Sequence, residues 1–174
     1  MAIAQSFLGE FEQQAPVTRK FLERVPEDKL TWQPHAKSMT AGQLALHLAR
    51  VPGSVVRRVQ EPSMQAPDFG SFPQPASREE VLNAFDDSVT AMRELMPRLD
   101  DAAMRATFRV LAGEQEVMAA PREGFLRSIA FNHCYQHRGQ LAVYLRLLDV
   151  PVPGSFGPSA DEAPALPQAR TVVA

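Results

Sequence analysis

The sequence predicts a small all-α protein built as a four-helix bundle. Four segments repeat apolar residues at spacings of three and four, which gathers those residues on one face of a helix. A stretch rich in proline and glycine separates the second segment from the third and predicts one long crossover loop. At 174 residues the chain has the length of a single domain. We expect residues 1–153 to form the bundle and residues 154–174 to form an irregular tail, because the tail lacks apolar periodicity.

The composition is that of an ordinary compact protein. Apolar residues make up 45% and charged residues 22% of the chain, which argues against disorder and against a coiled coil. A net charge of -2 provides no positive field to gather nucleic acid, so no nucleic-acid partner is expected. No stretch approaches the ~18 uninterrupted apolar residues of a membrane span, and the start of the chain lacks the features of a secretion signal. We therefore expect a cytoplasmic protein that does not act at a membrane.

The first two helices are expected over about residues 7–25 and 40–60. Proline removes a helical hydrogen bond, so Pro16 is expected to kink the first helix. The pair Pro52-Gly53 is expected to kink or interrupt the second helix for the same reason. Residues 61–75 are expected to hold no regular structure, and a crossover of this length lets the second and third helices lie parallel.

The third helix is expected to begin at Ser77, because Ser77 and Glu80 have the spacing of a capping box. Its apolar stripe continues to about Leu99. Residues 107–118 are compatible with a short hairpin and equally with a loop. Pro121 suits the first turn of the last helix, and a Pro-rich segment near residue 150 ends that helix.

Three histidines lie in the apolar stripes of two predicted helices. His133 and His137 are four residues apart in the last helix, so their side chains leave one face about 40° apart and about 6 Å along the axis. His47 lies in the stripe of the second helix. An unpaired imidazole in a protein core is costly, whereas a metal ion gives each ring nitrogen a partner. The spacing therefore indicates a metal site with His47, His133 and His137 as ligands and at least one coordination position left open. The alternative is three hydrogen-bonded core histidines without an ion.

Two stretches resemble a known family. They are TWQPHAKSMTAGQLALHLA and NHCYQHRGQLAVYLRLLDVPVPGSFGPSADE, and they look like the DinB-like family of small bacterial metal-binding four-helix proteins. The likeness extends from the first helix to about Glu162. It implies an up-up-down-down bundle, a metal site of three histidines at His47, His133 and His137, and a homodimer. Characterised members of the family include metal-dependent thiol transferases and a thiol-dependent isomerase.

These features favour a metal-dependent enzyme that activates a thiol or water for transfer or hydrolysis on a small molecule. A metal ion with an open position lowers the pKa of bound water to about 7. The substrate is expected to be a small molecule, with a low-molecular-weight thiol as a possible cosubstrate. No glutamate stands beside the histidine pair as in the His-Glu-x-x-His motif, which argues against a zinc protease. The alternative is a non-enzymatic metal-binding or stress-response bundle protein.

The sequence indicates the class of the metal ion but not which ion it is. Imidazole suits several divalent transition metals, and Zn or Ni is the expected ion. No protein residue is assigned a catalytic role, because the ion itself can generate the nucleophile.

Four further residues near the histidines have expected roles. Gln43 and Gln140 each lie about one turn from a histidine and are expected to orient its ring. Cys134 is turned about 100° from its neighbour His133 around the helix, so it is expected to be a buried small residue and not a ligand. Tyr144 is expected to fill the core, with a hydroxyl directed at substrate as the alternative.

The remaining candidates lie further from the histidines. Arg138 and Arg146 either bind an anionic group of a substrate or are solvated cations on an exposed face. Asp161 and Glu162 either fold back near the site or lie against a partner subunit, and nothing in their spacing requires either. His35 follows a proline in a loop and is expected to contact backbone, so it is not counted as a ligand.

Overall fold

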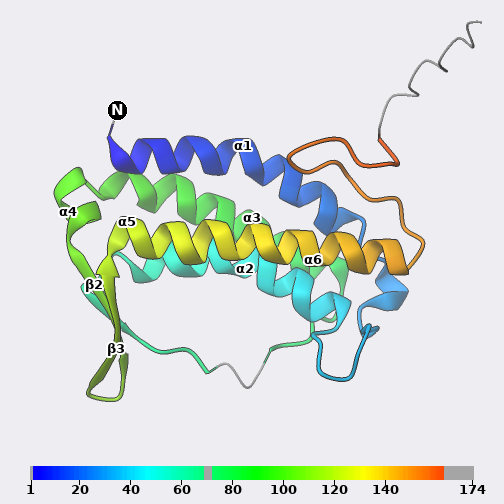
Figure 1. Ribbon diagram of the computed structural model, residues 1–174, viewed down its shortest axis with the longest axis horizontal. Helices are drawn as coiled ribbons and strands as arrows, with labels where there is room; N and C mark the ends of the chain where they lie inside the picture. The colour runs from blue at the N-terminus through cyan, green and yellow to red at the C-terminus, as the bar shows by residue number, and fades with distance from the viewer. Residues whose placement is uncertain (1, 69–71, 163–174) are drawn as a thin grey trace, which may run out of the picture.

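The computed structural model describes residues 2–68 and 72–162. Four long helices lie lengthwise against one another, and a small sheet extends from one end of the bundle (Figure 1). The long helices are α1 (Ile3–Glu23), α2 (Ala41–Arg58), α3 (Arg78–Leu95) and α6 (His133–Leu147). The shorter helical segments are η1 (Glu27–Lys29), η2 (Met96–Arg98), α4 (Asp101–Arg105), α5 (Arg122–Phe125) and η3 (Leu126–Asn132). Among the described residues, no helix is both long and apolar enough to cross a bilayer.

The core fills the space between the four long helices. Each of them contributes fully buried apolar side chains, among them Leu22, Leu48, Met92 and Leu145. The apolar stripes expected from the sequence are therefore the faces that the helices bury.

The long crossover makes α2 and α3 parallel, as expected. Arg50 of α2 pairs with Glu80 of α3, and seven residues further along both helices Arg57 pairs with Asp87. Residue numbers therefore rise together along the two helices, as they do only when the helices are parallel.

α1 and α6 run in the opposite direction to α2 and α3. Residue numbers rise along α1 as they fall along α3, because Glu12 pairs with Arg93 and Arg19 with Asp86. At one end of α2, Val59 accepts from Arg122, which precedes α6; at the other end, Met39 accepts from Tyr144, which lies late in α6. The order of directions is therefore up, down, down, up, and the up-up-down-down order is wrong. The physical reason is that a single long crossover keeps only one consecutive pair parallel, while the short connection after α1 turns the chain back.

The sheet has the strand order β1-β2-β3. β1 (Ser63–Gln65) pairs with β2 (Thr107–Ala112) in parallel, and β2 pairs with β3 (Gln115–Pro121) in antiparallel. The hairpin interpretation is confirmed, and Gly113 takes the positive φ of 62° that its turn requires. The expectation of no regular structure in residues 61–75 is wrong for β1, because Pro62 lies just before the strand and leaves the next three residues free to pair.

α2 continues without a break through Pro52 and Gly53. The expected interruption is absent from this described helix, and Gly53 instead lets α3 approach closely. A Cβ added at Gly53 would lie 2.7 Å from the Cα of Ser88. Pro16 lies inside α1, which bends in its second half (Figure 1).

The described part of the tail is irregular and folds over the ends of α1 and α6. Arg24 at the end of α1 binds the carbonyl oxygen of Pro151 and the carboxylate of Glu162. Residues 163–174, the rest of the expected tail, lie outside the described residues.

Candidate metal centre

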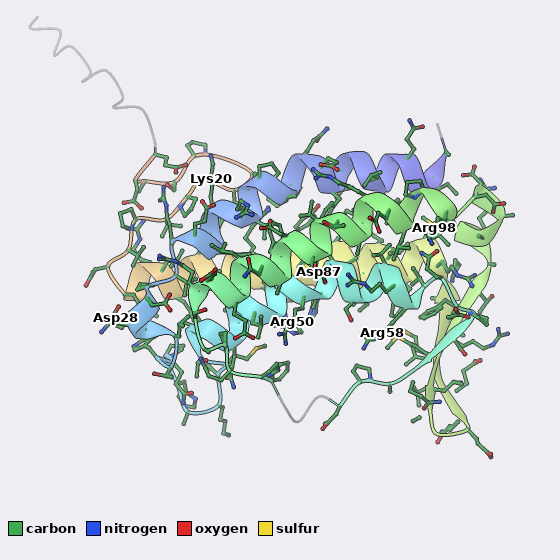
Figure 2. All side chains as sticks on the ribbon, turned by 180° about the vertical axis from the view of Figure 1, so that it is seen from behind. Lys20, Asp28, Arg50, Arg58, Asp87 and Arg98 are labelled. Carbon is green, nitrogen blue, oxygen red and sulfur yellow. The ribbon has the colours of Figure 1, made fainter. Side chains whose placement is uncertain are left out.

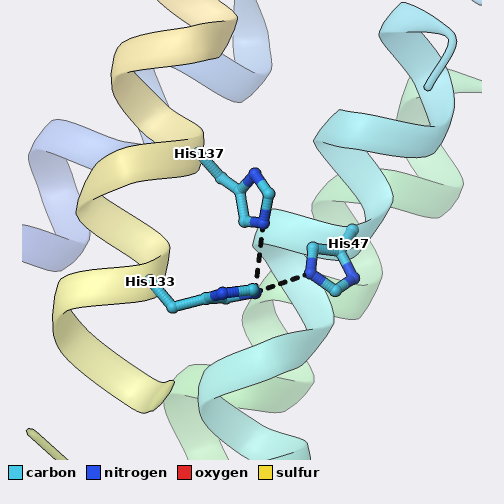
Figure 3. Close-up of side chains that lie close together, drawn as sticks. All are labelled: His47, His133 and His137. Carbon is cyan, nitrogen blue, oxygen red and sulfur yellow. Dashed lines mark hydrogen bonds between the residues drawn. The ribbon is translucent and has the colours of Figure 1, made fainter. Parts of the chain in front are cut away.

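Three imidazole rings converge between α2 and α6 (Figure 3). Nε2 of His133 lies 2.9 Å from Nε2 of His47 and 3.1 Å from Nε2 of His137. One ligand nitrogen from each ring lies within 4.8 Å of the other two. Bonds of about 2.0–2.1 Å to a tetrahedral ion would separate two ring nitrogens by about 3.3 Å, so this donor set fits a divalent metal. The three histidines singled out in the sequence are thus brought together.

The helix that carries His133 and His137 changes its winding directly before the site. η3 is a π-helix that ends at Asn132, and α6 begins at His133. A π-helix places more residues in each turn than an α-helix does, so it rotates the residues that follow relative to those that precede. The periodicity predicted one regular helix here and gave no sign of the π segment.

Burial favours the neutral form of the three imidazoles. Desolvation, followed by the neighbouring His137 and His133, lowers the pKa of His47 to about 4. Desolvation is also the main cause that lowers the pKa of His133 and of His137. A neutral imidazole presents a lone pair, which is the form that binds a metal ion.

Gln140 holds the ring of His137, as expected. Its Oε1 lies 2.6 Å from Nδ1 of His137. An amide oxygen can only accept, so this contact places the ring proton on Nδ1 and leaves the lone pair on Nε2, which faces the other histidines.

Gln43 does not contact a histidine ring in the described structure, which corrects the expectation. Its Oε1 accepts from the backbone N–H of Thr40, and its Nε2 donates to the carbonyl oxygen of Phe72. The Phe72 ring in turn lies edge-on to His47, with 5.4 Å between ring centroids. Gln43 therefore acts on His47 indirectly, because its hydrogen bond to Phe72 holds the Phe72 ring against His47.

Tyr144 and Cys134 have structural roles. The Tyr144 hydroxyl donates to the carbonyl oxygen of Met39 at 3.2 Å, and its ring packs against Trp32, so the core interpretation is confirmed. Cys134 is buried, and desolvation raises the pKa of its thiol to about 12. It is a packed neutral thiol and not a member of the histidine cluster.

Arg138 is buried, and neither role expected for it is correct. Its side chain is only 1% exposed. The guanidinium donates to Thr18 Oγ1 at 3.2 Å and to Gln14 Oε1 at 2.9 Å. It also lies over the rings of Tyr135 and Phe156. Arg138 thus joins α1, α6 and the tail. No pattern in the sequence indicated this, because arginine is rarely buried without a carboxylate.

The other charged candidates hold the tail in place. Arg146 pairs with Asp161 at 2.5 Å, and Glu162 accepts from Arg24 and from the backbone N–H of Gly154. His35 is exposed, and its Nδ1 accepts a backbone N–H two residues on, so it contacts backbone as expected.

An up-down-down-up helix bundle with three convergent histidines fits the class of metal-binding bundle proteins. The family model of the DinB superfamily matches residues 10–141. The match covers most of the chain, and the protein belongs to this superfamily.

Individual relatives agree with this membership. The chain is 24% identical over 157 residues to the uncharacterized protein YrdA of Bacillus subtilis, covering 90% of this chain and 89% of that protein. A DinB-like protein from Bacillus cereus has a similar fold, with a TM-score of 0.68, 20% identity, and coverage of 86% of this chain and 95% of that one. The DinB-like protein YjoA of Bacillus subtilis gives a TM-score of 0.63, 19% identity, and coverage of 86% and 96%. At such identities the solved structures show a shared fold and nothing further.

Proposed function

We propose that the chain is a metal-dependent enzyme that binds one divalent ion, Zn or Ni, through His47, His133 and His137. The single observation that supports this most directly is the convergence of three Nε2 atoms, with contacts of 2.9 and 3.1 Å. Three neutral imidazoles form a typical donor set for a divalent transition metal.

The reaction we propose is activation of a thiol or water for transfer or hydrolysis on a small molecule. When bound, the ion supplies Lewis acidity that lowers the pKa of a coordinated thiol or water. The cluster itself contains no carboxylate or thiol among the described residues. Its neutral ligands would leave the charge of the ion uncompensated, which favours an anionic fourth ligand such as a thiolate.

The protein residues prepare the site for an ion. His137 is buried, and Gln140 fixes its ring through Nδ1. Phe72 covers one edge of His47. These contacts hold the donor atoms in place before an ion arrives, which lowers the ordering cost of binding.

Elemental analysis of purified protein tests the metal site. His137→Ala is the test variant, and His35→Ala is the matched control because His35 is exposed and lies outside the cluster. The wild type and the control should hold about one ion per chain, and His137→Ala should hold little. Equal metal content in all three proteins would contradict the site assignment.

A screen of thiol-transfer and hydrolysis reactions with the same proteins tests the enzyme. The wild type and His35→Ala should be active on a shared substrate, and His137→Ala should be inactive. Metal binding without activity in any reaction would favour the second candidate, a non-enzymatic metal-binding or stress-response bundle, which the same histidine cluster supports equally.

A small-molecule substrate with a low-molecular-weight thiol, a homodimeric assembly and a cytoplasmic location are further parts of the proposal. Light scattering of the purified protein would test the dimer, and a single-chain mass would refute it.

A further inference from the structure

A second polar feature lies on the outer surface of the bundle, on α2 and α3. It is a groove of about 600 Å³ between α2 and α3. The groove is lined by Arg50, Ser54, Arg57 and Arg58 from α2, and by Glu80, Ala84, Asp87 and Ser88 from α3. Figure 2 shows Arg50, Arg58 and Asp87 along these two helices.

The floor of the groove is closed where the two helices approach each other. Gly53 has no side chain, so the backbone of α2 comes close to Ser88. The Ser88 hydroxyl is buried and donates to the carbonyl oxygen of Ala49 at 2.7 Å. The floor is therefore tightly packed, and the groups left to bind a ligand are those on its walls.

The walls carry more positive than negative charge. Arg50 and Arg57 are half-exposed and pair with Glu80 and Asp87. Three arginines thus face two carboxylates in the lining.

Arg58 differs from the other two arginines. In the part of the chain that the structure describes, its guanidinium donates to the hydroxyl of Ser54 and has no carboxylate partner. An arginine with free donors beside a serine hydroxyl is a typical site for a carboxylate or phosphate group, which a guanidinium binds through two parallel hydrogen bonds.

The groove and the histidines share one helix. Ser54 and Arg58 follow His47 by seven and eleven residues, which places them within about 20° of His47 around the axis of α2. Along the axis they lie about 10 and 16 Å from it. A small molecule could therefore place an acidic group in the groove and a reacting group at the metal centre.

We propose that the α2–α3 groove binds the carboxylate or phosphate group of an anionic small molecule. That this molecule is the substrate rests on the proposed function, whereas binding of the anion rests on the groove alone. The class of substrate is then an acidic small molecule whose reacting group lies about 10–16 Å from its acidic group.

Isothermal titration with two probes tests the groove: pyrophosphate for phosphate chemistry and tricarballylate for carboxylate chemistry. At least one probe should bind the wild type. Arg58→Gln should weaken that binding about ten-fold, because a charge-assisted hydrogen-bonded pair is lost. The matched control is Arg98→Gln, which removes the same charge from an arginine outside the groove and should bind as the wild type does.

A variant that is expected to bind the probe more tightly than the wild type provides a second test. Asp87→Asn removes the carboxylate that competes for Arg57, so it should bind the probe several-fold more tightly. Absence of binding by the wild type to both probes would overturn the proposal. Equal affinity in Arg58→Gln and Arg98→Gln would also overturn it.

Metal content separates this proposal from the proposed function. Arg58→Gln should keep the metal content of the wild type. Probe binding that depends on Arg58 in a protein that holds no metal would support the groove and refute the proposed function. A protein that binds metal and is active, but whose groove binds neither probe, would support the proposed function and refute the groove.

Discussion

The side-chain oxygen of Gln140 lies 2.6 Å from Nδ1 of His137, one turn further along α6. This contact fixes which nitrogen of the ring carries the proton, and so which nitrogen is free to bind an ion. Gln140 itself is exposed at the surface while His137 is buried. A surface glutamine therefore controls the tautomer of a buried ligand.

Gln140→Ala should weaken metal binding. Loss of a hydrogen bond behind a metal-binding histidine typically costs 10–100-fold in affinity, so we expect about ten-fold or more. Competition with a chelator of known affinity measures the change.

Gln136→Ala is the control for Gln140→Ala, because Gln136 is another exposed glutamine of the same helix. Its affinity for metal should match that of the wild type. If both variants bind metal as the wild type does, the contact with His137 has no functional role.

Much of the site was predictable because its histidines lie in the apolar stripes of two helices. The stripe that contains His133 and His137 fixes which face of α6 is buried, and the same argument holds for His47 on α2. Once two buried stripes belong to neighbouring helices, their histidines lie near each other. His47 could therefore be assigned to the same cluster as the pair His133 and His137, 86 residues or more away, from the sequence alone.

The predictions that were wrong concern features that depend on contacts between segments distant in the chain. The directions of α1 and α6 follow from pairs such as Glu12 with Arg93, and no local pattern encodes such a pair. One of the rings that cover Arg138 belongs to Phe156 in the tail, eighteen residues later. Residues 63–65 become a strand only because β2 is present to pair with them.

Cys134 should be unreactive in the folded protein. Desolvation raises its pKa to about 12, above the ordinary value of 9.0, so the thiol stays protonated at pH 8 and the thiolate that reacts is scarce. A disulfide reagent such as dithionitrobenzoate should modify the native protein far more slowly than the urea-unfolded protein. Cys134→Ser should keep the metal content of the wild type. Rapid labelling of the native protein, or loss of metal in the variant, would contradict this assignment.

Arg138 should stabilise the fold through packing and stacking. Its guanidinium bonds Thr18 and Gln14 and lies over two rings, while its Nε atom has no hydrogen-bond partner among the described residues. Arg138→Ala should lower the free energy of unfolding by about 2–4 kcal/mol, because it leaves a cavity and unpaired polar groups. Urea denaturation measures this change.

Phe156→Ala tests the stacking separately. Phe156 is 72% exposed and lies over Arg138, with 5.0 Å from the guanidinium carbon to the ring centroid. We expect a loss of about 0.5–1 kcal/mol, the size of an exposed cation–π contact. Val143→Ala, at another exposed apolar residue, should change stability by less. Equal effects at the two positions would mean that the ring contributes no stacking.

Two glycines in helices should respond to alanine with opposite signs. At Gly53 a Cβ would lie 2.7 Å from the backbone of Ser88, so Gly53→Ala must push α2 and α3 apart. We expect it to lower the free energy of unfolding by about 1–3 kcal/mol, the usual cost of overpacking. At Gly139 a Cβ would meet no described atom within 4 Å, so Gly139→Ala should raise stability by about 0.5–1 kcal/mol through its better helix propensity. Thermal denaturation of both variants measures these changes.

Gly53→Ala should also weaken binding of the anionic probe, because Gly53 sets the distance between the helices beneath the α2–α3 groove. Gly139→Ala should leave that binding unchanged. A stable Gly53→Ala protein with wild-type probe affinity would show that the close contact of α2 and α3 shapes neither the fold nor the groove.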